Sequence, residues 1–248
     1  MELRFLGTGS AFADTHNNAY FYKDDNLYII DLSMLSFAKA KEKVINTVNR
    51  VYIFLTHLHS DHASGVGLMA QWLFYIKNKT PIIVLPEAIS KDFLDDMEAT
   101  GVERRLFKVV SISSKDNVSL LLNAEDQYDG DKADVLNDIR STLIETIPTE
   151  HVPNLKGKCF GYKLHINKDI VYTGDTATLD NFIEKLNPDD EFYCEMSYYY
   201  GIVHLLWKEC DNQLKKLSKT NDIYLMHLDD KDAMRKAISG TRIRLAST

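Results

Sequence analysis

The segment Thr56-His57-Leu58-His59-Ser60-Asp61-His62 constrains this chain more than any other part of its sequence. It holds three histidines and an aspartate directly after the run Val51–Leu55, whose β-branched and aromatic side chains predict a buried strand. The cluster is therefore expected on a loop at the carboxyl end of a strand, where open α/β sheets place ligand sites. Imidazole and carboxylate groups are the usual protein ligands of zinc-like ions.

The spacing within this cluster predicts two neighbouring metal ions. Four ligand-type side chains on one tight loop can hardly all face a single ion. His57 and His59, two residues apart, can point to one side, and the adjacent Asp61 and His62 to another. The alternative is a set of solvated loop histidines, but three of the eight histidines of the chain meeting an aspartate at one strand end argue against it.

Three further polar positions each follow an apolar run that predicts a strand. His151 lies in Thr149–Pro153, Asp175 lies in the segment Thr173-Gly174-Asp175-Thr176, and His227 follows Ile223–Met226. Taken singly, each has an ordinary explanation: a capped loop histidine, a turn aspartate and a solvated histidine at a strand end. Their order and shared context favour a common site.

Together with the pattern His-x-His-x-Asp-His and the following Ala63-Ser64-Gly65, these segments resemble the signature of the metallo-β-lactamase fold superfamily. The resemblance runs from the amino-terminal Leu3–Ser10 to His227. It implies a four-layer αββα sandwich formed by one domain over residues 1–248. It also implies one metal bound by His57, His59 and His151, a second bound by Asp61, His62 and His227, and Asp175 as the bridge between them.

Composition and patterning fit such a fold. A length of 248 residues with 45% hydrophobic residues suits one α/β domain. Strands are expected at Leu3–Leu6, Ala19–Tyr22, Leu27–Ile30, Val51–Leu55, Ile82–Leu85, Val118–Leu122, Leu143–Ile147, Phe160–Ile166, Ile170–Thr173, Phe192–Cys194 and Ile223–Met226. Helices are expected at Val66–Ile76, Ala88–Met97, Leu179–Leu186 and Leu205–Leu217. Asp24-Asp25-Asn26 reads as a hairpin turn.

The sequence favours a cytoplasmic protein with no membrane partner. It has no apolar stretch of membrane-spanning length and no secretory signal. Its three cysteines, Cys159, Cys194 and Cys210, lack metal-type spacing and are expected to be free thiols in a reducing compartment.

Two positions between the third and fourth motifs resemble the ribonuclease Z branch of the superfamily. Glu195 is followed nine residues later by His204, which precedes the predicted helix Leu205–Leu217. The resemblance implies that His204 donates a proton to the leaving oxygen, that Glu195 orients it and keeps it basic, and that Asp61 belongs to the catalytic set. A poor alkoxide leaving group needs such an acid. The alternative is a helix-terminal histidine with no catalytic role.

Departures from the tRNA-processing members of that branch favour a smaller substrate. Those enzymes carry a long arm between the isolated histidine and the bridging aspartate, whereas here His151 and Asp175 lie only 24 residues apart. The net charge of −7 also argues against a broad phosphate-binding surface. We therefore expect a small phosphodiester, such as a cyclic nucleotide or a short oligonucleotide, and not a folded tRNA.

Paired divalent ions lower the pKa of a shared water and polarise carbonyl or phosphoryl oxygens, so the sequence predicts a hydrolase. Phosphodiesterase activity is the first expectation, with a bridging hydroxide as the nucleophile. An acyl hydrolase of the lactonase, thioesterase or β-lactamase kind is the alternative. A non-enzymatic metal-binding protein and an iron-dependent oxygen- or electron-handling variant are weaker ones. Zinc is the expected metal, with manganese or iron also compatible, and a homodimer is compatible with the sequence.

Four other features carry secondary expectations. Asp31, at the end of Leu27–Ile30, is expected to hydrogen-bond a metal-binding histidine and so fix its tautomer. Ala124–Asp134 is expected to be an exposed acidic loop. A third feature is a basic group that could form a small patch but is expected to be solvated surface: Lys77, Lys79, Arg104, Arg105 and Lys108. The fourth is an aromatic group that could line a substrate cleft but is expected to pack in the core or at an interface: Trp72, Phe74, Tyr75 and Tyr198–Tyr200.

Overall fold

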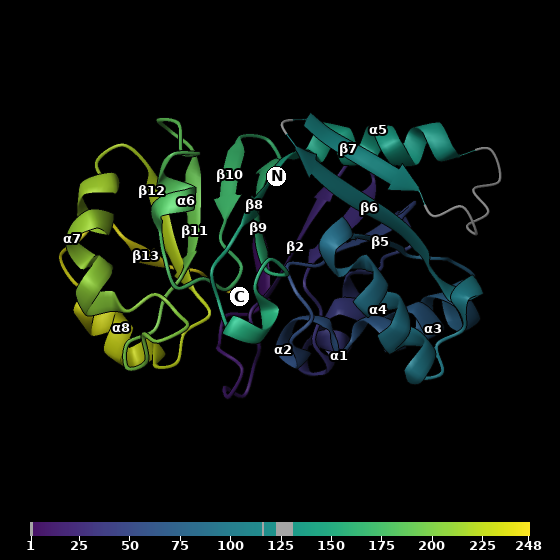
Figure 1. Cartoon of the computed structure of the whole chain (residues 1–248), viewed down its shortest axis with the longest axis horizontal. Helices are drawn as coiled ribbons and strands as arrows, with labels where there is room; N and C mark the ends of the chain where they lie inside the picture. Colours follow the sequence, from purple (N-terminus) through teal and green to yellow (C-terminus); the bar gives the residue numbers. More distant parts are fainter. Residues whose placement is uncertain (1, 116, 123–130) are drawn as a thin grey trace.

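The computed structural model describes residues 2–115, 117–122 and 131–248 and contains two β-sheets (Figure 1). The strands of the first sheet lie side by side in chain order: β1 (Arg4–Gly7), β2 (Asn18–Lys23), β3 (Asn26–Ile30), β4 (Val51–Phe54), β5 (Ile82–Pro86), β6 (Lys108–Lys115) and β7 (Asn117–Leu122). The second sheet has the order β13 (Arg244–Leu245), β12 (Asp222–Met226), β11 (Glu191–Glu195), β10 (Asp169–Tyr172), β9 (Phe160–His165) and β8 (Leu143–Pro148).

Helices cover the outer faces of both sheets, and Figure 1 shows the two helical groups at opposite sides of the molecule. The first group is α1 (Met34–Lys43), α2 (Ser60–Ala63), α3 (Val66–Lys77) and α4 (Glu87–Ala99), followed by a short 3₁₀ turn at Arg104–Leu106. The second group is α6 (Asp180–Ile183), α7 (Trp207–Leu217) and α8 (Lys231–Ala237). Helix α5 (Lys132–Thr142) joins the two sheets, and a second 3₁₀ turn spans Pro153–Leu155.

The alternation of side chains along the strands shows why four layers form. On β4, Val51 and Ile53 pack in the core beneath helices α1, α3 and α4, whereas Tyr52 and Phe54 pack in the core between the two sheets. On β12, Leu225 packs in the core beneath α7 and α8. Successive residues of a strand face opposite sides, so a strand that is apolar on both faces must be covered on both. The predicted αββα sandwich is confirmed.

Strand direction brings the predicted site loops to one edge. Strands β3 to β6 run parallel to one another, and so do β10 to β13. β8 is antiparallel to β9, which is antiparallel to β10, so β8 runs in the same direction as β10. The loops after β4, β8, β10 and β12 therefore leave their sheets at carboxyl ends, where ligand sites of α/β folds form.

Several predicted boundaries were wrong. Helix α7 begins at Trp207, not Leu205, because the carbonyl of Leu205 accepts a hydrogen bond from Ser197 N. The helix predicted at Leu179–Leu186 is limited to α6, and helices α1 and α8 and strands β6 and β13 were not predicted. The histidine and aspartate cluster was expected on a loop, but Asp61 and His62 lie on α2, whose first turn forms because His62 N and Ala63 N both donate to His59 O. The hairpin turn was predicted correctly: Asp24 and Asp25 join β2 to β3 with positive φ angles.

The acidic segment Ala124–Asp134 lies largely outside the described residues. Its last residues, Lys132–Asp134, form the first turn of α5 and are not loop. Val135 and Ile139 on that helix are buried in the core between the sheets, and this tertiary contact decides the local structure.

Two expectations about chain chemistry can be compared with the structure. Cys159, Cys194 and Cys210 are free thiols, as predicted. In the part of the chain that the structure describes, no helix combines the length and apolar character needed to cross a membrane.

Candidate metal centre

The first group of potential ligand atoms comes from the loops after β4, β8 and β10. His57 Nε2 lies 3.1 Å from His59 Nδ1, which lies 3.3 Å from His151 Nε2. Asp175 Oδ2 lies 3.9 Å from His57 Nε2 and 3.6 Å from His151 Nε2. The structure thus brings four residues, which sequence reasoning had grouped, around one point.

The second group shares Asp175 with the first. His62 Nε2 lies 3.1 Å from Asp61 Oδ2 and 3.3 Å from Asp175 Oδ1. His227 Nε2 lies 3.3 Å from Asp61 Oδ2 and 3.5 Å from Asp175 Oδ2. Asp175 therefore belongs to both groups.

These residues fit divalent metal ions on two grounds. Ligand nitrogens about 2.0–2.1 Å from a tetrahedral zinc lie about 3.4 Å apart, close to the spacings of both groups. His62 Nε2 and Asp175 Oδ1 are also fully buried without a hydrogen-bond partner, although they lie near one another. A buried polar atom without a partner is costly, and a metal ion would remove that cost here.

Asp31 fixes the orientation of the ligands from beneath. Its Oδ2 accepts hydrogen bonds from His62 Nδ1 and Thr56 Oγ1, each at 2.8 Å, and its Oδ1 accepts one from Thr56 N at 2.8 Å. Thr56 Oγ1 also lies 3.0 Å from His57 Nδ1. These contacts direct the Nε2 atoms of both histidines toward the ligand groups, which is the role expected of such a carboxylate.

The protonation of the cluster follows from burial and charge. Burial, with the neighbouring His62, lowers the pKa of His57 well below its usual value, which favours the neutral imidazole that binds metal. Burial also acts to lower the pKa of His62, but the carboxylates of Asp175 and Asp31 outweigh it and raise that pKa. Burial opposes ionisation of Asp175, yet His227 and His62 hold its pKa well below the ordinary value.

His204 lies beside both ligand groups and is bound to Glu195. Its Nδ1 lies 2.7 Å from Glu195 Oε2 and 3.9 Å from Asp175 Oδ2. Glu195 is fully buried, its Oε1 accepts a hydrogen bond from Thr176 N, and its Oε2 lies 3.4 Å from His227 Nδ1. Burial acts to lower the pKa of His204, but the carboxylate of Glu195 raises it above the usual value. The carboxylate of Glu195 therefore favours the protonated form of His204.

Asn18 was not predicted, yet it connects Asp61 of α2 to the first sheet. Its Nδ2 donates to Asp61 O at 3.1 Å, and its Oδ1 accepts from Ser33 N at 3.1 Å. The residue is completely buried at the start of β2. A polar side chain directly before the apolar run Ala19–Tyr22 was the only signal in the sequence.

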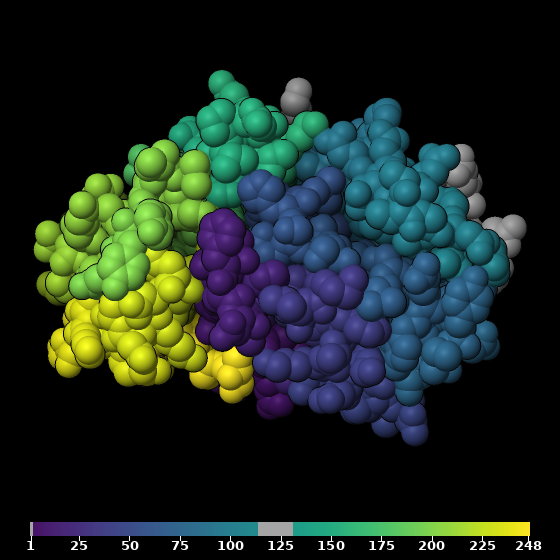
Figure 2. All heavy atoms as spheres, turned by 90° about the horizontal axis from the view of Figure 1, so that it is seen from below, coloured from purple at the N-terminus to yellow at the C-terminus, as the bar shows by residue number. Residues whose placement is uncertain are grey.

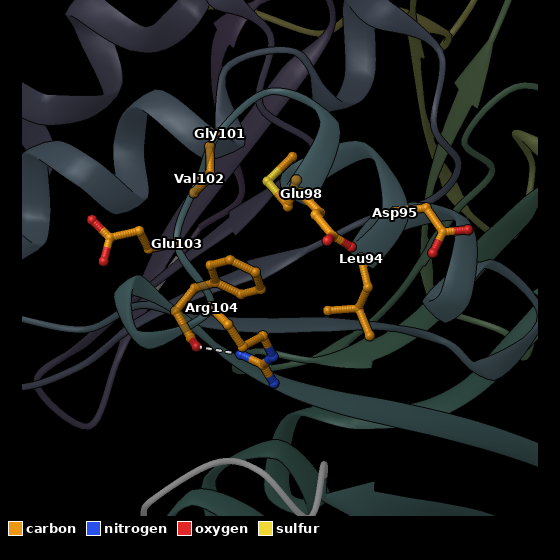
Figure 3. A pocket seen from close by; sticks show the side chains of 9 residues that line it. Leu94, Asp95, Glu98, Gly101, Val102, Glu103 and Arg104 are labelled. Atoms are coloured by element: carbon orange, nitrogen blue, oxygen red, sulfur yellow. Dashed lines mark hydrogen bonds between the residues drawn. The ribbon is translucent and has the colours of Figure 1, made fainter.

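The other candidate groups lie elsewhere. A hollow of about 570 Å³ beside α4 is lined by Asp95, Glu98 and Glu103 among others and contains no histidine or cysteine (Figure 3). In the predicted basic group, Lys79 Nζ donates to Val48 O, Arg105 pairs with Glu103, and Lys108 lies 3.8 Å from Asp131. These cations serve local contacts.

The two predicted aromatic groups differ. Trp72 packs edge-on against Phe37 of α1, and Phe74 packs beneath the guanidinium of Arg105, so the α3 aromatics support packing. Tyr198, Tyr199 and Tyr200 are exposed, between Glu195 and His204.

Comparison with known proteins agrees with this geometry. The chain matches the family described as "Anti-Pycsar protein Apyc1" over residues 1–246. Anti-Pycsar protein Apyc1 of Saccharibacillus brassicae is 25% identical over 177 residues, which are 71% of this chain and 67% of the relative. The protein of the same name from Paenibacillus sp. (strain J14) is 26% identical over 183 residues, 71% of this chain and 66% of the relative. The matched stretches thus span about two thirds of these relatives' length.

A ribonuclease Z and several solved structures are also similar. Ribonuclease Z of Methanococcus maripaludis (strain C5) is 24% identical over 228 residues, 75% of this chain and 70% of the relative. Bacillus subtilis YhfI, a metallo-β-lactamase fold protein, has a TM-score of 0.71 at 16% identity, covering 99% of this chain and 95% of its own. A diphosphatase of the PhnP family has a TM-score of 0.69 at 15% identity, covering 99% of this chain and 94% of its own. Human short-form tRNase Z has a TM-score of 0.63 at 17% identity, covering 92% of this chain and 93% of its own.

The predicted membership of the metallo-β-lactamase fold superfamily, with ribonuclease Z among the relatives, is confirmed. The fold, the relatives and the clustered histidines and aspartates together support a metal-dependent hydrolase.

Proposed function

This chain belongs to the anti-Pycsar protein Apyc1 family, and on that premise we propose that it is a dinuclear metal-dependent phosphodiesterase that hydrolyses a cyclic nucleotide. The metal ligands are His57, His59 and His151 for one ion, Asp61, His62 and His227 for the other, and Asp175 for both. Two divalent ions held there would acidify a shared water and polarise the phosphoryl oxygens.

The observation that carries the proposal is the pair formed by His204 and Glu195. Hydrolysis adds water to phosphorus and breaks the bond from phosphorus to the ribose oxygen, which must leave as a hydroxyl. His204, with Nδ1 bound to Glu195 Oε2 at 2.7 Å, supplies that proton from Nε2. An acid positioned in this way contributes about 10²- to 10⁴-fold to the rate. Acyl transfer from an activated ester or lactam depends less on such a group.

The size of the substrate is supported by what surrounds the site. His151 and Asp175 lie 24 residues apart, and the segment between them contains the 3₁₀ turn at Pro153–Leu155 and the hairpin of β9 and β10. This compact connection leaves little chain to grip a large RNA. The net charge of −7 likewise offers little attraction to a long phosphate backbone.

The test compares leaving groups. The metal-loaded protein and its His204→Ala variant are assayed on bis(p-nitrophenyl) phosphate and on a 3′,5′-cyclic nucleotide. Because p-nitrophenolate leaves without protonation, the variant should lose far more activity on the cyclic nucleotide than on the aryl ester. Equal losses on both substrates would remove the acid role from His204.

Asp61→Ala serves as the metal-dependent reference and should inactivate the protein on both substrates. A fully metal-loaded wild-type protein that cleaves neither phosphodiester would overturn the proposal. A panel of lactones, thioesters and lactams would then test the acyl hydrolase alternative.

A further inference from the structure

Two loops that carry exposed aromatic rings are fastened to the turn directly after His227. The loop between β1 and β2 is held by Leu228, whose N donates to Thr8 O at 2.8 Å and whose carbonyl accepts from Ser10 N at 3.0 Å. This loop carries Phe12, whose side chain is completely exposed.

The second loop, Ser197–His204, is held by the next residue of the same turn. The carboxylate of Asp229 accepts hydrogen bonds from Ser197 Oγ at 2.6 Å, Tyr198 N at 2.7 Å and Tyr199 N at 3.0 Å. Tyr199 Oη donates to Asp230 Oδ2 at 3.0 Å. The backbone of this loop is therefore fixed at the point where it presents its three tyrosines.

The other end of the second loop is bound to the candidate metal centre. The carbonyl of Val203 accepts a hydrogen bond from His151 Nδ1 at 2.8 Å, and the next residue is His204. The loop thus runs from the Asp229 carboxylate to two residues of the site. Figure 2 shows the amino-terminal loop, in purple, protruding at the middle of one face, next to the yellow-green and yellow segments.

The rings on these loops lack the cover that aromatic side chains usually receive. Tyr200 is 73% exposed and Tyr199 58% exposed, and Tyr199 touches both neighbouring tyrosines with ring centroids 5.0 and 6.3 Å apart. Exposed rings on a fixed backbone beside a catalytic site suit a flat ligand, because the loop loses little freedom when the ligand binds.

We propose that Phe12 and Tyr198–Tyr200 form the wall on which the nucleobase of the cyclic nucleotide stacks while its phosphate lies at the two metal-ligand groups. This inference rests on the proposed function. It assigns the two parts of the substrate to different elements: the strand-end ligands take the phosphodiester, and the two loops held by Leu228 and Asp229 take the base. Stacking on an aromatic ring depends on the π-face and not on the phenol oxygen.

The test measures KM for a 3′,5′-cyclic nucleotide and for an abasic 3′,5′-cyclic ribose phosphate. Loss of one stacking ring should raise KM for the nucleotide by about 5- to 100-fold, so Tyr200→Ala should raise the ratio of the two KM values by that factor. Tyr200→Phe, which keeps the ring, should restore the ratio. Tyr75→Ala is the matched control, because Tyr75 is 57% exposed on α3 and is held by Arg105 and not by the turn after His227.

Each outcome has a distinct meaning. An unchanged KM ratio in Tyr200→Ala and in Phe12→Ala, with both substrates still cleaved, would overturn the base wall and leave the phosphodiesterase intact. A wild-type protein inactive on both substrates would instead overturn the proposed function. A change in the mass of the protein in solution, without a change in the KM ratio, would identify the tyrosines as a contact between two copies of the chain and would also overturn the base wall.

Discussion

Charged side chains lie at both ends of β4, but the two clusters differ in how completely they are hydrogen-bonded. At its amino end, one atom, Asp138 Oδ2 of α5, accepts hydrogen bonds from Tyr52 Oη at 2.6 Å, Asn26 Nδ2 at 3.1 Å and Arg50 Nη1 at 3.2 Å. At its carboxyl end, His62 Nε2 and Asp175 Oδ1 lie 3.3 Å apart and are buried without a hydrogen-bond partner. The hydrogen bonds of the first cluster are all made within the protein, whereas the second cluster contains two buried polar atoms that make none.

This difference separates a structural cluster from a binding one. Burial and the hydrogen bond to Asp138 raise the pKa of Tyr52, so the phenol stays protonated and keeps donating. Such a closed network holds α5 against the first sheet. A buried polar atom without a hydrogen-bond partner raises the energy of its site and so favours a ligand that supplies the missing contact. The following predictions test whether the two ends differ in this way, beginning with the largest effect.

Asp175→Ala should abolish activity, with a loss of at least about 10³-fold, because one carboxylate serves both ligand groups. Metal analysis of the purified variant should show less than half of the wild-type content. The rise in melting temperature on adding Zn²⁺ or Mn²⁺ should also disappear. Asp169→Asn, at the first residue of the strand β10 that precedes Asp175, is the control and should retain metal and activity. Full metal content in Asp175→Ala would show that the carboxylate does not bridge.

Asp31→Asn should weaken metal binding by about 10- to 100-fold while the protein stays folded. The amide of this variant is neutral and has only one oxygen, so it accepts hydrogen bonds from His62 and Thr56 less strongly than the carboxylate does. The tautomer of His62 is then no longer fixed. Competition with a chelator of known affinity measures the change. Unaltered affinity would mean that Asp31 supports only the backbone of the loop.

Glu195→Gln should shift the alkaline limb of the kcat profile to lower pH and lower kcat near neutrality by about tenfold. The sign follows from the acid role. Activity requires protonated His204, Glu195 raises its pKa, and burial alone lowers it. Removing the carboxylate therefore deprotonates His204 at a lower pH. An alkaline limb at the same pH in the variant would mean that a group other than His204 produces this limb.

Asp138→Ala should lower the free energy of unfolding by about 1–3 kcal/mol, since it removes the acceptor of three hydrogen bonds. Metal content and KM should not change, because the cluster lies at the opposite end of β4. Urea denaturation of the metal-loaded protein measures the stability. A loss of metal together with stability would show that the two ends of the strand are coupled.

Sequence reasoning worked best where chemistry and local pattern coincide. His57, His59, Asp61 and His62 follow one apolar run within six residues, and the structure groups them in the predicted pairs, the first two before α2 and the last two on it. Prediction from the sequence failed where contacts between distant residues decide the local secondary structure. Residues Lys132–Asp134 look like acidic loop, yet α5 forms because Val135 and Ile139 are buried between the sheets. Likewise Leu205 looks helical, but its carbonyl is held by Ser197.

The sequence by itself determined the types of candidate ligand, their order and the strand ends that they follow, because residue chemistry and the alternation of apolar side chains are local properties. Only the tertiary structure decided which atoms meet. The Asp31 contact with His62 and the shared turn after His227 join residues from separate strands and loops. Such contacts depend on how the two sheets pack and where their parallel strands end, and no local sequence pattern encodes the distance between residues of separate strands.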